Sequence, residues 1–441
     1  MRLSKRSFPA ALMMCAVLLA LGAPQRARAQ LELQVTSGVT DPIPIAIIPF
    51  AAAPAVSGDV AQIVQSDLEG SGRFKAMPRA QMRVYPARAA DVQLADWRAS
   101  GNDYVVVGRV SVLAPGQLAV DFDLLNALNG QPLASQRFTG TAAALRNAAH
   151  RVSDVIYEKI LGIRGAFATR IAYVSVSGEP PMQHFELIVA DADGANPSVV
   201  LESRSPVMSP AWSPDGEWLA YVSFEGKRSS VYVQQVRTGE RRLVSARAGI
   251  NGAPAWSPDG RRLALTLGGS AGNPDIYILD LATQDLTRIT NDPAIDTEAA
   301  WAADGRSIYF TSDRAGGPQI YQVGLAPGDR PRRITFSGSY NARPRLSPDG
   351  TQLAMVTLDN GSYRIAVQDL SNGTVRVLSR GQLDESPSFA PNGAMLLYAA
   401  MGAAHGQSVL QRVSVDGLTS ERLTSQQAGV REPAWAPFPR Q

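Results

Sequence analysis

The chain has 441 residues, and its 42 lysines and arginines nearly balance its 39 aspartates and glutamates, for a formal net charge of +3. Five of the basic residues and no acidic residue lie within residues 1–29, so the rest of the chain carries 42 − 5 = 37 basic against 39 acidic side chains, a net charge of −2. Because these basic residues are scattered and form no basic face, the charge argues against a nucleic-acid-binding protein.

Residues 1–29 have the features of a secretory signal peptide. Three basic residues precede the apolar run 10–21, and the small residues Ala27 and Ala29 end the segment. The apolar run is too short to span a bilayer. The only cysteine, Cys15, lies in this segment, so the mature chain has no thiol and suits an oxidising compartment. The sequence therefore predicts export; a retained N-terminal anchor is the alternative.

A small mixed domain is predicted after this segment. Residues 30–40 alternate apolar and polar side chains, which suits a short edge strand or a mobile tail. The elements predicted next are an apolar strand at 43–50, a helix capped by Ser57, strands at 104–112 and 117–126 joined as a hairpin, and a helix at 142–161 ended by Gly162. Strands combined with two amphipathic helices predict an α/β layer.

A turn motif recurs through the second half of the chain. The first copy is Pro-Ala-Trp-Ser-Pro-Asp-Gly at 210–216, and five near copies follow at 254–260, 298–305, 344–350, 387–393 and 433–437. Each period holds four short runs of β-forming residues and no helical stripe. The copies recur about every 45 residues. A period of this length with four strands indicates the blades of a propeller.

The two ends of the repeat region complement each other. Residues 170–175, 186–190 and 198–201 supply only strands two to four of a blade, and residues 431–437 supply only a first strand. Joined, they make a sixth blade, which would close the ring without a free strand edge. An open array of sheets is the alternative.

The predicted fold is therefore multidomain α+β. We expect a signal peptide at 1–29, a small N-terminal α/β domain with a mobile N-terminal segment at 30–163, and a six-bladed β-propeller at 164–441 closed by the C-terminal strand.

Few residues suggest catalysis or metal binding. The run 268–272 matches the nucleophile pattern G-x-S-x-G, but it joins two strands of a blade instead of a strand and a helix, and the only later histidine is His405. No His/Cys group has metal-ligand spacing, and 191–194 (DADG) has the composition of a turn between strands. The sequence predicts no catalytic residue, metal site or cofactor.

The residues that precede the first strand of each blade should gather at one mouth of the channel. Five acids lie there with two arginines, namely Asp296, Glu298, Asp384, Glu385 and Glu432 with Arg343 and Arg431. A concave, net-acidic mouth suits an inserted peptide or protein loop that carries donors and positive charge. Solvated turn residues without a ligand are the alternative.

The whole chain resembles the TolB family, the periplasmic components of the Tol-Pal system of Gram-negative bacteria. The resemblance is carried by NGAPAWSPDG at 251–260, DTEAAW at 296–301 and LDESPSFAPNG at 383–393, in this order and spacing. It implies a monomeric periplasmic protein without enzymatic activity or cofactor, which supports outer-membrane integrity and cell division. The alternative is a propeller-type periplasmic hydrolase or lyase, which would need a catalytic domain or an inward cluster of histidines and carboxylates.

The resemblance also implies two partners and where they bind. The outer-membrane lipoprotein Pal would bind the mouth, and through Pal the protein would lie at the outer membrane; the implied contacts are Asn251, Gly252, Ala253, Thr297, Glu298, Asp384 and Glu385. TolA, anchored in the inner membrane, would bind the mature N-terminus; the implied contacts are Gln30, Leu31, Glu32, Leu33, Gln34, Val35, Thr36 and Ser37. Ile250 departs from the family pattern, in which a histidine is familiar.

Overall fold

The structure is a computed structural model that describes residues 41–52, 56–269, 273–401, 407–423 and 429–439. Residues 42–441 form one compact unit. The predicted signal peptide at 1–29 and the predicted TolA-binding segment at 30–37 lie outside the described residues. Among the helices that the structure describes, none is both long and apolar enough to cross a membrane.

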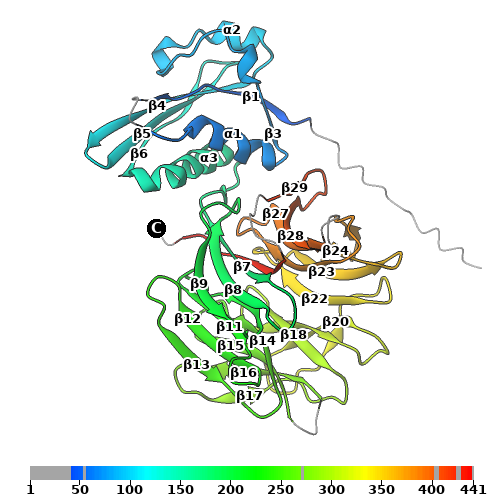
Figure 1. Cartoon of the computed structure of the whole chain (residues 1–441). Coiled ribbons are helices and arrows are strands. Elements are labelled where there is room, and N and C mark those ends of the chain that lie inside the picture. Colours follow the sequence, from blue (N-terminus) through cyan, green and yellow to red (C-terminus); the bar gives the residue numbers. More distant parts are fainter. Residues whose placement is uncertain (1–40, 53–55, 270–272, 402–406, 424–428, 440–441) are drawn as a thin grey trace, which may run out of the picture. The chain divides into compact units, whose positions relative to one another are not determined.

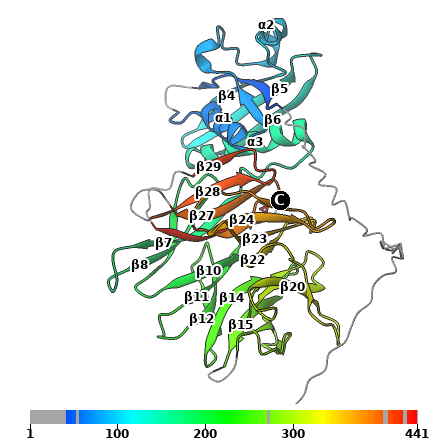
Figure 2. The same ribbon diagram turned by 90° about the vertical axis from the view of Figure 1, so that its right-hand side faces the viewer.

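The N-terminal part is a mixed sheet with helices on both faces. Its strands run in the order β3-β1-β4-β5-β6, with β2 paired to β4. Their bounds are β1 Ile43–Ile47, β2 Ala51–Ala52, β3 Phe74–Ala76, β4 Tyr104–Ala114, β5 Gln117–Asn126 and β6 Pro132–Thr141. Helices α1 Val60–Gly70 and α3 Leu145–Leu161 lie on one face and α2 Leu94–Ala99 on the other (Figure 2). Three short 3₁₀ turns are η1 Arg79–Gln81, η2 Ala89–Asp91 and η3 Ala142–Ala144.

The ends of these helices follow from local capping. The side chain of Asp59, and not the predicted Ser57, caps α1 by accepting a hydrogen bond of 3.0 Å from the backbone N–H of Gln62. Gly162 ends α3 as predicted, in the left-handed conformation with φ 72°, and its N–H donates to the Glu158 carbonyl at 2.8 Å. The apolar stripes of α1 and α3 then pack on the sheet, with Leu68 and Ile156 fully buried.

The second part is a six-bladed propeller of four-stranded antiparallel sheets, which follow one another from green to red in Figure 1. Five blades are consecutive in sequence. Their strands are β10 Val207–Trp212, β11 Trp218–Ser223, β12 Ser230–Gln235 and β13 Arg241–Ser245; β14 Ile250–Trp256, β15 Arg262–Gly268, β16 Asp275–Asp280 and β17 Leu286–Arg288; β18 Asp296–Trp301, β19 Ser307–Ser312, β20 Gln319–Gly324 and β21 Arg332–Arg333; β22 Asn341–Leu346, β23 Gln352–Asp359, β24 Ser362–Asp369 and β25 Val375–Val377; β26 Asp384–Phe389, β27 Met395–Met401, β28 Ser408–Ser414 and β29 Ser420–Arg422.

The remaining blade joins the two ends of the repeat region. Its order is β30-β7-β8-β9, with β7 Arg170–Ser177, β8 His184–Asp191, β9 Ser198–Ser203 and β30 Val430–Trp435. Strand β30 pairs antiparallel with β7, so that Val430 faces Ser175 and Trp435 faces Ile171. The predicted closure of the ring by the C-terminal strand is confirmed.

The tryptophan of the repeat couples neighbouring blades. The indole Nε1 of Trp256 donates to the carbonyl of Ala211 at 3.1 Å, and that of Trp301 donates to Ala255 at 3.0 Å. Each acceptor belongs to the first strand of the preceding blade. These tryptophans therefore contribute to the packing between blades.

The segment between α3 and the first propeller strand is held by one carboxyl group. Asp154 of α3 accepts hydrogen bonds from the backbone N–H groups of Phe167 at 2.7 Å and Ala168 at 3.3 Å. Burial raises the pKa of Asp154 to about 6, against the opposing effect of those two hydrogen bonds. A salt bridge of 2.6 Å between Arg73 and Asp416 gives a further contact of the helical layer with the propeller.

Candidate functional site: the propeller mouth

Every first strand of a blade carries a β-bulge at the same position. The residue in each bulge is not glycine, yet has a positive φ between 44° and 57°. These six residues, here called the bulge ring, are Ser209, Ala253, Glu298, Arg343, Ser386 and Glu432. Non-glycine residues in this conformation are uncommon and concentrate at functional sites.

The sequence around each bulge explains why the strand departs from regular pairing there. A proline follows the bulge residue in every blade except the one that contains Glu298, where Ala299 follows. Proline has no backbone N–H and is confined within sheets to edges and bulges. The first strands of neighbouring blades contact one another around the ring, so the bulges meet at the channel.

A cavity of about 340 Å³ opens at this mouth, and all six bulge-ring residues line it. A second cavity of about 580 Å³ occupies the other end of the channel, where the tryptophans of the first strands line it. Arg345 borders both cavities. The first volume falls in the range of pockets that bury a ligand group or an inserted side-chain cluster.

Arg343 is the electrostatic centre of the bulge ring. Its Nε lies 3.0 Å from a carboxylate oxygen of Glu298, and its other guanidinium nitrogens lie 3.8 Å from Glu432 and 4.0 Å from Glu385. The guanidinium also donates to the hydroxyl of Ser386. Burial lowers the pKa of Arg343, but the charges of Glu298, Glu432 and Glu385 outweigh burial and raise it overall. Two carboxylates of the ring, Glu298 and Glu432, thus share the guanidinium with Glu385 beside the ring, and the ring itself is net acidic, with two acids against one arginine.

Glu298 is held in place from both sides. One of its carboxylate oxygens accepts hydrogen bonds of 3.1 Å from the hydroxyl of Thr311 and from the backbone N–H of Arg343. Its side chain is still 23% exposed. A carboxylate that is positioned by the fold and open to the cavity is preorganised to accept hydrogen bonds from a partner.

Exposed apolar side chains lie at the same end of the blades as this polar centre, and two of them, Met208 and Ile250, line the cavity. They come from the loops before the first strands or from adjoining strand ends, which an antiparallel blade places at the same end. This apolar rim consists of Met208, Ile250, Ile295, Phe336, Tyr363, Leu383 and Met401, with exposed fractions from 37% to 74%. Exposed apolar groups that gather around a polar cavity are typical of protein interaction sites.

The structure divides the sequence-predicted mouth residues into two groups. Gly252, Ala253, Thr297 and Glu298 line the cavity with exposed surface, and Glu385 approaches Arg343. Asn251 also borders the cavity, but it is fully buried and its side chain accepts from Ser245 at 2.6 Å.

Asp296 and Asp384, two of the acids that the sequence places at the mouth, are held by groups of their own blades. Both are fully buried. Asp296 accepts hydrogen bonds of 2.8 and 3.0 Å from the guanidinium of Arg314, and Asp384 accepts one of 2.9 Å from the backbone N–H of Gly381. Burial raises the pKa of both carboxyl groups. They occupy the position of Asn251 in their own blades and hold the loop before the strand.

Sequence reasoning missed Ser209, which belongs to the ring and which the register of the repeat could have found, because it occupies the position equivalent to Glu298. It placed Arg343 at the mouth but did not predict the ring to which this residue belongs. It also missed a buried group at Asp67, His150 and Asp193, whose members are distant in sequence. Ser270 and His405, considered above for catalysis, lie outside the described residues.

Fold and site together define a protein in which a small α/β domain precedes a six-bladed propeller with a polar mouth. The chain belongs to the TolB family: it matches the family model of the TolB beta propeller domain over residues 157–439 and that of the TolB amino-terminal domain over residues 31–133.

Relatives with known names agree with this family. The chain is 47% identical over 431 residues to the Tol-Pal system protein TolB of Xanthomonas euvesicatoria pv. vesicatoria (strain 85-10), which covers 96% of this chain and 97% of the relative. It is 47% identical over 413 residues to the protein of the same name from Xanthomonas oryzae pv. oryzae (strain MAFF 311018), covering 92% and 93%. The crystal structure of TolB from Acinetobacter baumannii is similar with a TM-score of 0.83 and 42% identity, covering 90% of this chain and 97% of that one. The protein thus has a role in the Tol-Pal system.

Proposed function

We propose that the protein is a non-enzymatic periplasmic interaction module, which binds the lipoprotein Pal at the propeller mouth and TolA through its mature N-terminal segment. In this role it supports outer-membrane integrity and cell division as a monomer that reaches the outer membrane through Pal. The observation that carries the proposal is the mouth itself, a net-acidic bulge ring inside an apolar rim.

The chemistry of the mouth supports a protein partner over a small substrate. The apolar rim is spread over several blades, so it offers area rather than one enclosed pocket. The ring offers carboxylates fixed in place and open to the cavity. A partner that covers the rim would remove water from these carboxylates, so its donors or cations would make strong, specific contacts at the centre.

Glu298→Gln is expected to weaken Pal binding at least about tenfold, roughly 1.4 kcal/mol. The variant keeps the shape and an acceptor oxygen but removes the charge that a desolvated partner group would meet. Because Glu298 also accepts from Thr311 and Arg343, its melting temperature should be recorded with its affinity. Titration calorimetry with purified Pal measures the effect.

A rim variant separates recognition from local stability. Ile250 is 49% exposed, so Ile250→Asp should change stability little. Because the variant places a charge in the covered interface, Pal binding should fall by at least as much as in Glu298→Gln. Leu243 on β13 is 54% exposed but lies outside the mouth cavity, so Leu243→Asp is its control. Asp259→Asn tests the opposite end of the channel, where Asn392 already occupies the equivalent turn position. Equal losses from mouth and control variants would place the Pal site elsewhere.

Deletion of residues 30–37 is expected to abolish TolA binding and leave the melting temperature unchanged. The segment alternates apolar and polar residues, a pattern that can add to a sheet edge of a partner. Pal binding by the same deletion protein is the internal control for correct folding. Retained TolA binding would assign that partner to another surface.

A further inference from the structure

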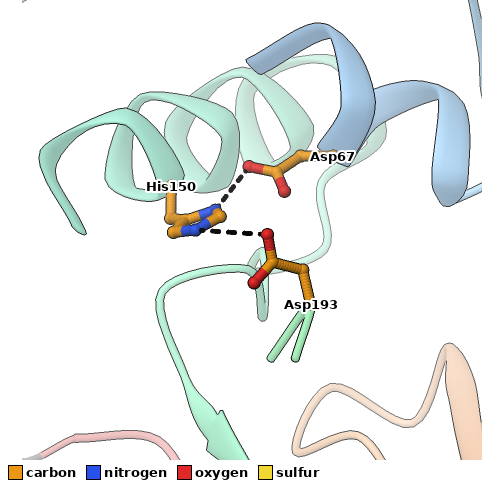
Figure 3. A group of neighbouring side chains, drawn as sticks. All are labelled: Asp67, His150 and Asp193. Atoms are coloured by element: carbon orange, nitrogen blue, oxygen red, sulfur yellow. Dashed lines mark hydrogen bonds and ion pairs between the residues drawn. The ribbon is translucent and has the colours of Figure 1, made fainter. Parts of the chain in front are cut away.

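A buried histidine connects the helical layer with the propeller. His150 on α3 is only 2% exposed. Its Nδ1 lies 2.8 Å from a carboxylate oxygen of Asp67 on α1, and its Nε2 faces Asp193 in the turn between β8 and β9 (Figure 3). The three side chains thus come from three segments that pack together only in the folded chain.

The Asp67 side orients the imidazole ring. Asp67 is also buried, and the same carboxylate oxygen accepts a hydrogen bond of 2.6 Å from the hydroxyl of Ser153. A carboxylate that accepts from the Nδ1–H of a histidine fixes the tautomer with a lone pair on Nε2. Metal-binding histidines are commonly held in this way by an outer carboxylate.

The Nε2 side is unsatisfied. The Nε2 atom is buried without a hydrogen-bond partner, and the nearest carboxylate oxygen, that of Asp193, is 3.9 Å away. This gap is too long for a hydrogen bond. Zinc bonds to nitrogen and oxygen of about 2.0–2.1 Å place two tetrahedral ligands roughly 3.4 Å apart. Asp193 therefore needs to approach by about half an ångström. Its side chain is 24% exposed in a turn, where it also contacts Arg146 and accepts a hydrogen bond of 3.1 Å from the backbone N–H of Ala195.

The surrounding charges also leave room for a cation. Arg146 contacts Asp193, and its Nε lies 3.4 Å from Asp191. With His150 neutral, the carboxylates of Asp67, Asp191 and Asp193 outnumber this one guanidinium by two charges. A cavity of about 20 Å³ borders Asp67 and Asp193, which is space for one water molecule beside these two carboxylates.

We propose that His150 and Asp193 form a binding site for a zinc-class divalent cation, with Asp67 as the outer carboxylate that orients the imidazole. An imidazole nitrogen with carboxylate oxygen suits zinc and the neighbouring transition metals, whereas magnesium prefers an all-oxygen site. A bound ion would link α3 to the propeller blade that contains β8 and β9. None of the three residues lines the mouth cavity.

Zinc titration of the untagged full chain, freed of metal by chelation, tests the site. We expect one zinc equivalent at pH 7.5, a rise of the melting temperature with zinc, and no rise with the same concentration of magnesium. Binding should weaken at pH 6, because His150 must lose its proton to ligate the metal.

Variants assign the ligands. His150→Gln and Asp193→Asn should each weaken zinc binding at least about tenfold; Asp193→Asn leaves the Asp67–His150 pair in place, so it remains informative if His150→Gln folds poorly. His184→Gln is the matched control, because His184 is 39% exposed and lies 3.8 Å from Glu186; it should bind zinc like the parent. Failure of the parent to bind zinc, or binding that survives Asp193→Asn and His150→Gln, would overturn the proposal.

Discussion

Removal of Arg431–Gln441 is expected to destabilise the propeller by more than about 5 kcal/mol, an amount comparable to the entire stability of many domains. The truncation deletes most of β30, the strand that completes the blade formed with β7, β8 and β9. The buried side chain of Trp435 alone is worth roughly 3–5 kcal/mol. Its Nε1 also donates to the hydroxyl of Thr169 at 2.8 Å, and the Ala436 N–H donates to the backbone carbonyl of Arg170 at 2.8 Å.

Thermal unfolding followed by circular dichroism measures this effect. Deletion of residues 439–441 alone is the control, because it keeps β30 and the stacking of Arg164 on Phe438, and its midpoint should match that of the full chain. The larger truncation should also show a free edge of β7, and so a greater tendency to aggregate. An unchanged midpoint for the larger truncation would mean that the ring does not depend on its closing strand.

Asp154→Asn is expected to change how stability depends on pH. The folded pKa of Asp154 is about 6, above its ordinary value of 3.8, so the folded state holds the proton more tightly than the unfolded state. Its favourable contribution is complete below about pH 3.8 and is lost as the pH rises through about 6. Relative to the asparagine variant, the parent should therefore lose about 2 kcal/mol between pH 4 and pH 6.5, allowing for partial exposure of the group.

Urea unfolding at several pH values provides the comparison. Because both proteins carry the same remaining titratable groups, the difference between their profiles reports on position 154. Asp304→Asn is the control, because Asp304 is exposed in the turn of the motif copy at 298–305. The stability of this variant should depend on pH as that of the parent does. Parallel profiles for the parent and Asp154→Asn would show that burial does not raise the pKa of Asp154 in the folded state.

The fold was largely predictable because the repeat carries it. Turn motifs spaced by a constant period specify blade number, strand order and the shared final blade without any knowledge of long-range contacts. The N-terminal part was harder. Strand β6 at Pro132–Thr141 has mostly exposed or weakly apolar residues, so no periodic pattern marked it. At α1, both Ser57 and Asp59 can cap, and only the path of the chain decides between them.

The mouth was predictable in place but not in detail. The direction of the first strands is enough to gather their preceding residues at one end. The left-handed bulge is not visible in the sequence, because Glu298, Arg343 and Ser386 are not the glycines that announce such a conformation. Burial of Asp296 depends on Arg314 from the neighbouring hairpin, which is a tertiary effect. The His150 group likewise needs α1, α3 and a propeller turn to come together.

The bulge ring separates the shape of the mouth from its chemistry. Six different blades hold serine, alanine, glutamate or arginine in one backbone geometry, at a conformational cost of about 1–3 kcal/mol for each residue. The surrounding blade packing meets that cost whatever the side chain is. Substitutions at these six positions can therefore alter the charge pattern that a partner meets without altering the scaffold. Partner specificity in such a propeller can diverge between lineages, one blade at a time, while the fold stays constant.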